Sequence, residues 1–177
     1  SHPLSSKHKV FLAKHIRDLS HNLTDERENR RIGYMNETTA LSAYVHYFMW
    51  WNLVRLTKLF SNMDKSFFDS LTDESICLDI GSGPLTVVTA LFLSRPELRN
   101  KKLTWYCMDL SSQALAFGED IFLSVAARLQ CEPWKIIRVK GNFGSSIKQK
   151  ADLVTTANLF NELQEKSKPQ EIKNSTE

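Results

Sequence analysis

Apolar residues follow two different periods along this chain, and the change falls at about residue 73. In the first part they recur three and four positions apart, a spacing that places side chains on one face of a helix. One such run covers residues 10–19, and a longer one covers about 37–60 behind Asn36, a residue type that commonly caps helices. The pattern therefore predicts an α-helical region over residues 1–73.

From residue 76 onward, short apolar runs alternate with helical patterns, as strands and helices do in a parallel α/β sheet. The sequence predicts strands over residues 76–80, 103–108, 136–140 and 153–157. It predicts helices over 84–94, with Pro84 at the first helical position, and over 112 to about 129, with Ser111 as N-cap. The expected fold class is α/β: a Rossmann-like parallel sheet of about four strands over residues 74–163, between the helical region and a polar tail over 164–177.

Two glycines and two aspartates lie at the ends of the first two predicted strands. Gly81 and Gly83 form a turn after the first strand, where glycine can adopt positive φ and lets the backbone approach a ligand closely. Asp79 precedes this turn, and Asp109 follows the second strand. Because right-handed crossovers bring the carboxyl ends of parallel strands to one edge, we expect these residues to meet there. The arrangement predicts a nucleoside-cofactor site.

The spacing of these residues favours S-adenosylmethionine over a dinucleotide. A dinucleotide fingerprint has a third glycine or alanine three residues after the second, where this chain has Thr86. Its acidic residue comes about 20 positions after the turn, whereas Asp109 lies 28 positions after Gly81. Asp79 adds a carboxylate that would repel a pyrophosphate and that suits an ammonium group instead.

Three segments resemble the class I S-adenosylmethionine-dependent methyltransferases. Asp79-Ile80-Gly81-Ser82-Gly83 resembles their motif I, Asp109-Leu110-Ser111 resembles their ribose-binding acidic position, and residues 152–158 resemble their fourth strand. With Pro84 and the run Asn161-Glu162-Leu163, these segments are similar to the mitochondrial and bacterial ribosomal small-subunit methyltransferase-like family. The resemblance spans about residues 76–163 and implies methyl transfer to ribosomal RNA.

The resemblance implies roles for the residues of the glycine turn. Gly81, Ser82 and Gly83 would lie against the methionine part of the cofactor. Asp79 would hold the ammonium group of the cofactor, directly or through water. A tight turn is the structural alternative for the glycines, and a helix N-terminal carboxylate is the alternative for Asp79.

Further roles fall on residues after the second, third and fourth strands. Asp109 would accept both ribose hydroxyls, or would instead cap the following helix. Leu110 would cover one face of adenine, and Asn142 or Phe143 would meet the adenine edge and face. Asn158 would position the accepting atom of the substrate, or would be a turn residue. No side chain is marked as a general base.

An aromatic cluster lies in the helix predicted over about 37–60, where Tyr44, Tyr47, Phe48, Trp50 and Trp51 occur close together. Helical spacing favours packing of this stripe against the following region. The alternative is that Tyr47 or Trp50 lines a pocket in which a planar substrate stacks on the rings.

The loop just before that helix is the better candidate for a substrate pocket. It contains Tyr34 and Asn36 and is followed by a helix start. Loops held by a rigid element often carry binding residues, so we expect this loop to contact the substrate.

The net charge is +3, and its distribution along the chain is uneven. Residues 7–31 contain seven Lys and Arg residues, and residues 135–150 contain five with no acidic residue. Either segment could contact RNA phosphates, although an ordinary solvated surface explains the same composition.

No apolar run reaches the roughly 18 residues that a membrane-spanning helix needs, so no membrane partner is expected. Cys77, Cys107 and Cys131 show no Cys-x-x-Cys spacing, and two of them lie in predicted strands. We therefore expect free core thiols, no metal site and a reducing, cytoplasmic location.

The chain departs from the resembled family after the fourth predicted strand. The family sheet has seven strands, whereas about 20 residues follow here, rich in Lys, Glu and Ser. We expect either a fragment or an uncovered strand-four edge through which the chain could self-associate. Three functions stay open: methylation of RNA, methylation of a small-molecule metabolite, and a catalytically silent, partner-binding module that keeps the nucleotide fold.

Overall fold

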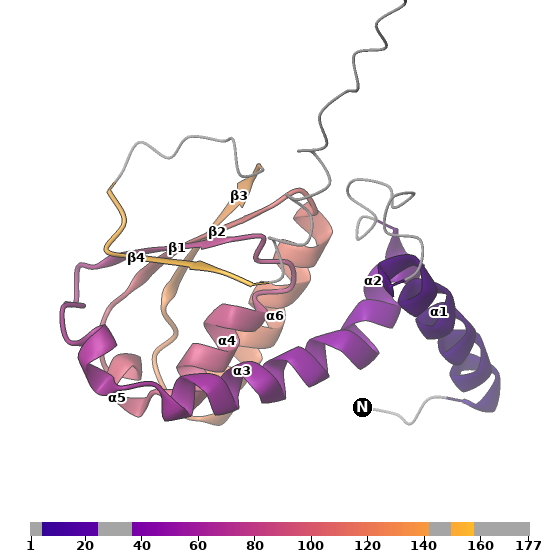
Figure 1. The fold of residues 1–177 in the computed structure, drawn as a ribbon, viewed down its shortest axis with the longest axis horizontal. Coiled ribbons are helices and arrows are strands. Elements are labelled where there is room, and N and C mark those ends of the chain that lie inside the picture. Colours follow the sequence, from indigo (N-terminus) through magenta and orange to yellow (C-terminus); the bar gives the residue numbers. More distant parts are fainter. Residues whose placement is uncertain (1–4, 25–36, 142–149, 158–177) are drawn as a thin grey trace, which may run out of the picture.

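The computed structural model describes residues 5–24, 37–141 and 150–157 of the chain. Its strands form one parallel sheet in the order β3-β2-β1-β4 (Figure 1). The strands are β1 Ile76–Ile80, β2 Thr104–Asp109, β3 Lys135–Lys140 and β4 Leu153–Thr156. The α/β, Rossmann-like fold class is therefore confirmed, and every strand lies within one residue of its predicted bounds.

The strand order reverses at β1. β2 and β3 extend the sheet on one side of β1, and β4 joins its other side. Ile80 pairs with Met108 of β2 and with Thr156 of β4, so the carboxyl ends of these three strands are level. Ligands of open parallel sheets bind beyond the carboxyl ends at such a reversal. The fold thus points to the edge where the glycine turn lies.

Three helices follow β1 and β2: α4 Thr86–Ser94, α5 Pro96–Arg99 and α6 Ser112–Arg128. α6 packs on β2 and β3, and α4 packs beside α6 and α5. Figure 1 shows α4 and α6 on the same side of the strands. The hydroxyl of Ser111 accepts a hydrogen bond from the Ala114 N–H at 3.1 Å, so its predicted N-cap role is confirmed.

The start of α4 differs from the prediction. Pro84 is not the first helical residue, because Leu85 has φ 54 and ψ 35, in the left-handed region, and α4 begins only at Thr86. The Leu85 N–H donates to the Ser82 carbonyl at 3.0 Å, which places Pro84 inside a turn. A left-handed leucine costs about 1–2 kcal/mol. Leu85 is fully buried in the core, and this packing holds the conformation.

The core between the sheet and the helices is aromatic. Trp134 stacks on Trp105 at 5.9 Å between ring centroids and meets Phe92 edge-on at 4.9 Å. Its indole N–H donates to the Leu98 carbonyl at 3.1 Å, which satisfies the buried polar atom. Leu53 and Phe60, from the N-terminal region, join this same cluster. One hydrophobic core therefore continues across the predicted boundary near residue 73.

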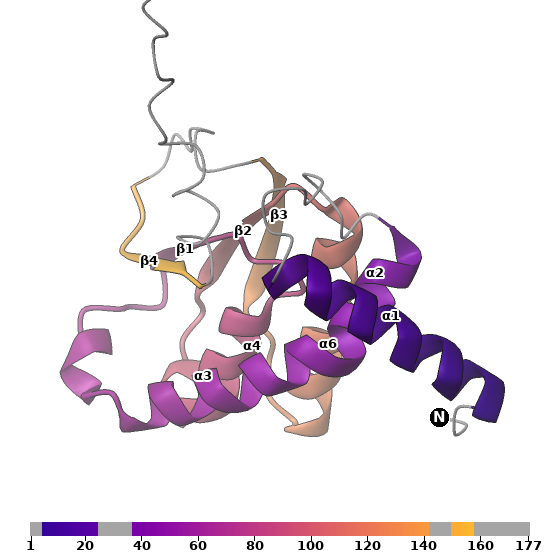
Figure 2. The ribbon, with the colours of Figure 1, turned by 45° about the vertical axis from the view of Figure 1, so that its right-hand side comes forward.

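The N-terminal region is helical, as predicted: α1 Ser6–Thr24, α2 Thr38–Ala43, a π-helix η3 Tyr44–Met49, α3 Trp50–Asn62 and a 3₁₀-helix η4 Lys65–Phe68. α1 packs beside α2, and α3 packs on α4 (Figure 2). The N-cap of α2 is Glu37, one residue later than the predicted Asn36, which lies outside the described residues.

The π-helix changes which side chains of the long helix are buried. Counting at regular α-helical spacing places Trp51 in the inward stripe, but Trp51 is 60% exposed, and Tyr47 and Trp50 beside it are exposed as well. The buried positions are Val45, as predicted, and then Met49 and Leu53, which were not predicted to face inward. A π-turn holds more residues than an α-turn, because its hydrogen bonds run from i to i+5. Every later side chain is therefore rotated relative to an uninterrupted α-helix.

Arg95 connects the end of α3 to the core beside α4. Its side chain is 4% exposed, and its Nη2 donates to the Met63 carbonyl. The guanidinium lies 5.0 Å from the centroid of the Phe68 ring, and Nη1 is 3.3 Å from Glu97 Oε1. These contacts fix the segment that joins the N-terminal helices to β1.

The two edge strands of the described sheet differ in charge. β3 carries Lys135, Arg138 and Lys140, all exposed, which is how natural sheets discourage pairing with another chain. β4 carries no charged residue, and its Val154 is 54% exposed. Self-association through β4 stays a prediction.

All three cysteines are free thiols, as predicted. Cys77 and Cys107 are fully buried, and burial raises the pKa of Cys77 to about 12 and that of Cys107 further. Along the described residues, none of the helices has both the length and the apolar character needed to span a bilayer.

Candidate functional site

The turn after β1 has the backbone geometry that its glycines predicted. Gly81 has φ 72 and Gly83 has φ 50, both in the left-handed region that glycine adopts without steric cost. The N–H groups of Gly81 and Ser82 both donate to the Met108 carbonyl at the end of β2, at 2.9 and 3.0 Å. The turn is therefore held against the neighbouring strand.

Every N–H group of residues 81–85 is engaged or absent. Besides the two bonds to Met108, the Gly83 N–H donates to Asp109 Oδ2 at 2.9 Å and the Leu85 N–H donates to the Ser82 carbonyl. Pro84 has no N–H. Glycine loops that bind phosphate do so by presenting free N–H groups. This turn presents none of its own, so it is not built to hold a phosphate.

Asp109 lies at the end of β2, next to the glycine turn, as the sequence predicted. Its Oδ2 accepts from Gly83, and its Oδ1 accepts from the Ser111 N–H at 2.8 Å. Burial raises the pKa of Asp109 above its usual value, although the N–H groups that bond to it act in the opposite direction. The side chain is half-buried, and each carboxylate oxygen has a second lone pair available to a ligand hydroxyl.

Asp79 is fully buried beneath the turn. The Ser82 hydroxyl donates to Oδ2 at 2.6 Å, and the Thr155 hydroxyl of β4 donates to Oδ1 at 2.8 Å. Burial raises the pKa of Asp79 from 3.8 to about 6, opposed by these two hydroxyls and reinforced by the charge of Asp109. Asp79 therefore ties β1, the turn and β4 together. Because Asp79 is 0% exposed, a direct contact with a cofactor ammonium would require the side chains around it to move aside.

The sequence analysis missed two residues that shape this edge. Thr155 pairs with Asp79 across β1 and β4, a contact that depends on strand register and has no local signal. Gly118, in α6, lies so close to the turn that an added Cβ would be 2.6 Å from the Pro84 carbonyl oxygen. An isolated glycine inside a helical pattern is the signal that could have identified it.

Thr86 begins α4 directly after the turn. Thr86 is 7% exposed, and its hydroxyl has no hydrogen-bond partner within the described part of the chain. Buried hydroxyls are usually satisfied, but the buried hydroxyls of Thr57 and Thr89 also have no partner among the described residues, so this feature is not particular to the turn.

The other predicted site residues divide into two groups. Leu110 is half-buried and follows Asp109 directly, so it lies at the same edge. Tyr47 and Trp50 are on the outer surface of η3 and α3. Five residues lie outside the described residues, so their predicted roles stay predictions: Tyr34, Asn36, Asn142, Phe143 and Asn158.

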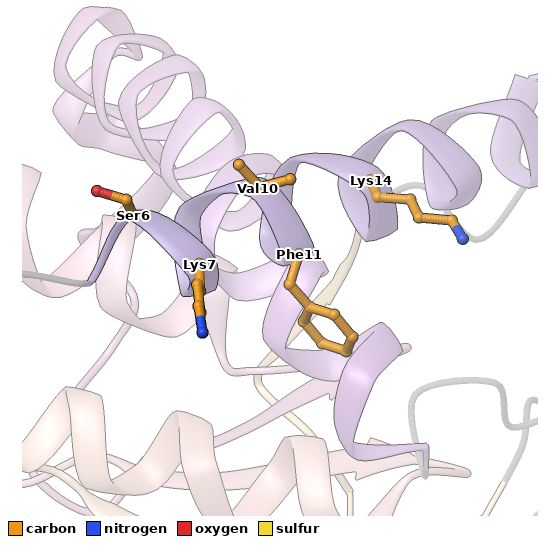
Figure 3. Close-up of a pocket in the computed structure, with 5 residues that line it drawn as sticks. All are labelled: Ser6, Lys7, Val10, Phe11 and Lys14. Atoms are coloured by element: carbon orange, nitrogen blue, oxygen red, sulfur yellow. The ribbon is translucent and has the colours of Figure 1, made fainter.

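An open depression of about 500 Å³ lies on the N-terminal region, against one face of α1. Among the described residues, its lining comes from α1: Ser6, Lys7, Val10, Phe11 and Lys14. Figure 3 shows Val10 and Phe11 along the helix between the two lysines. This depression contains none of the carboxyl-edge residues.

No protein-family model matches the sequence, and a search of curated proteins found no match either. The class of the protein is therefore defined by its fold, a Rossmann-like α/β protein whose glycine turn meets two aspartates at the carboxyl edge of the sheet.

Proposed function

We propose that this chain is an S-adenosylmethionine-dependent methyltransferase. The observation that carries the proposal is the bond from the left-handed Gly83 N–H to the Asp109 carboxylate at the neighbouring strand end. This bond places a backbone without a side chain beside the half-buried carboxylate of Asp109. A nucleoside without phosphates can then approach the backbone closely and donate its ribose hydroxyls to that carboxylate. The engaged N–H groups of residues 81–85 disfavour the diphosphate of a dinucleotide. The resemblance to methyltransferase motif I points to the same cofactor.

The chemistry asks little of the side chains. The sulfonium of this cofactor is already activated, so the protein mainly aligns the methyl group with its acceptor. In this proposal Asp109 accepts the ribose hydroxyls and Leu110 covers adenine.

RNA is the proposed methyl acceptor. Exposed basic residues support it on α1 (Lys7, Lys9, Lys14 and Arg17) and on β3 (Lys135, Lys140 and Arg138, the last 3.1 Å from Glu119). They belong to the basic segments 7–31 and 135–150. Binding through phosphates would weaken steeply with salt.

Isothermal titration calorimetry with S-adenosylmethionine and S-adenosylhomocysteine tests the cofactor proposal. We expect Asp109→Ala to weaken binding about tenfold or more, because it removes a charged hydrogen-bond acceptor. Asp120→Ala, which changes an exposed carboxylate of α6, is the matched control and should bind like the parent. Thermal unfolding of each variant shows whether the fold is intact. Absence of heat with a folded parent would exclude cofactor binding.

A second candidate function is a catalytically silent binding module that keeps the nucleotide fold. It is favoured by one observation: each oxygen of Asp79 and Asp109 already accepts a hydrogen bond from the protein. Both aspartates would then be structural. A folded parent that binds neither cofactor, and whose Asp109→Ala variant loses only stability, would favour this candidate.

A further inference from the structure

The outward face of α3 is apolar and uncovered. Tyr47 in η3 is 44% exposed, and Trp50, Trp51 and Val54 of α3 are 55%, 60% and 62% exposed. They recur at helical spacing, so they form one continuous surface, which we call the α3 outer face. The opposite side of α3 packs on α4 through Leu53 and Phe60.

The α3 outer face has a one-sided charge. Arg55 and Lys58 are exposed at its C-terminal end, one turn beyond Trp51 and Val54. The sequence from Thr38 to Met63 contains no Asp or Glu. An apolar surface with two cations at one end, and no carboxylate along its own helix, complements a partner with apolar side chains bordered by carboxylates.

The composition of this face favours a protein over a nucleic acid. Trp, Tyr and Arg are enriched among the residues that dominate protein interfaces, whereas Asp and Glu are depleted. Val54, its most exposed apolar member, offers no ring on which a base could stack. Two cations beside four large apolar side chains are few for a surface that follows a phosphate backbone.

A second copy of this chain fits the face poorly. In a twofold-symmetric contact the same patch meets itself. Arg55 and Lys58 of one copy would then find no carboxylate on the α3 outer face of the other, because residues 38–63 contain no Asp or Glu. Cations that lose water in an interface without gaining an opposite charge oppose association.

We infer that the α3 outer face is a docking surface for a protein partner that presents apolar side chains flanked by carboxylates. Trp50 and Trp51 would contribute most of the apolar contact, and Arg55 and Lys58 would favour a partner with negative charge. The inference is independent of the proposed methyltransferase function, because no residue of the carboxyl-edge site takes part.

The chain carries its own reporter for this test. Of its four tryptophans, Trp105 and Trp134 are 0% and 3% exposed, whereas Trp50 and Trp51 are open to solvent. Quenching of fluorescence by acrylamide therefore reports mainly on the α3 outer face. Two synthetic helical peptides of about 16 residues serve as probes, with identical leucines at i, i+3, i+4 and i+7 and either Glu or Lys at the flanking positions. A single-stranded RNA of about 12 nucleotides is the third probe.

We expect the Glu peptide to protect the exposed tryptophans from acrylamide and the Lys peptide to bind about tenfold more weakly or not at all. Arg55→Glu with Lys58→Glu should reverse this preference, measured with fluorescently labelled peptides. The double substitution Trp50→Ser with Trp51→Ser should weaken binding of the labelled Glu peptide about tenfold or more. Leu123→Ser, which changes a 43% exposed residue of α6, should leave binding unchanged.

Three results would overturn the inference. The first is equal binding, or no binding, of the two peptides to the parent. The second is RNA binding that the tryptophan variant abolishes, which would make the face a nucleic-acid surface. The third is a concentration-dependent dimer in sedimentation that the tryptophan variant dissociates, which would make a second copy the occupant. Loss of cofactor binding in the Asp109→Ala variant bears on none of these results.

Discussion

Burial of Asp79 makes its protonation part of the folding equilibrium. The side chain ionises near its ordinary pKa of 3.8 in an unfolded chain, whereas burial raises the pKa to about 6 in the folded protein. Between these values the folded state binds a proton that the unfolded state has released. Stability that is present below pH 4 is therefore lost as the pH rises through 6.

We expect the Asp79→Asn variant not to lose stability in this way as the pH rises, because an amide does not titrate. The free energy of unfolding of the parent, measured with urea, should fall by up to about 3 kcal/mol more than that of the variant between pH 4 and pH 7. Asp120→Asn, which replaces an exposed carboxylate of α6, is the control. Its unfolding free energy should change with pH as that of the parent does. A difference between parent and Asp79→Asn that does not change with pH would contradict the expectation.

Single residues also show what the sequence could predict at this site and what it could not. The glycines and Asp109 were identified because their chemistry and their strand-end positions are local features. Thr155 was missed because its bond to Asp79 depends on the pairing of strands 76 positions apart. The left-handed Leu85 was also missed, since only its burial, not its residue type, favours that conformation.

Among the secondary-structure elements, the strands were predicted within one residue, and the helix boundaries less well. Apolar runs between turn residues define strands locally. The π-helix between α2 and α3 left no such signal, because its sequence satisfies α-helical spacing equally well. The error reversed the predicted burial of Trp51, which the structure leaves exposed.

Close packing of α6 against the glycine turn gives a test at the level of elements. Gly118→Ala would place a Cβ against the backbone of Pro84, which cannot move as a flexible side chain could. We expect a loss of about 1–3 kcal/mol in unfolding free energy, although alanine favours the helix by about 1 kcal/mol. Gln113→Ala, an exposed site in the same helix, should be neutral or stabilising. Equal stability of the two variants in thermal unfolding would show that α6 lies farther from the turn.

Over the whole molecule, α3 shares one core with the sheet, whereas α2 and η3 form a second, smaller cluster with α6. Arg95 fixes the connection between α3 and the sheet. The sequence predicted both regions but not this buried cation, whose partners come from α3, η4 and the start of α5. Charged residues are rarely fully buried unless paired, so a buried arginine cannot be assigned from composition alone.

Arg95→Met keeps the apolar stem but removes the bond to Met63 and the contact with Phe68. We expect a loss of about 2 kcal/mol, because hydrogen bonds to charged groups contribute more than neutral ones. Hydrogen exchange should rise at the C-terminal end of α3 more than in β1. Arg128→Met, at the exposed end of α6, is the control. Uniform exchange changes across α3 and β1 would argue against a local anchor.

The left-handed Leu85 links the interior of the protein to the glycine turn, where we propose that the cofactor binds. A leucine keeps that backbone shape only while the surrounding side chains hold it in place. Loosening the interior anywhere around this leucine would let the backbone relax and take the neighbouring glycine and proline with it. We therefore expect substitutions in the core around Leu85 to lower cofactor affinity at the turn, even where the substituted residue does not contact the turn.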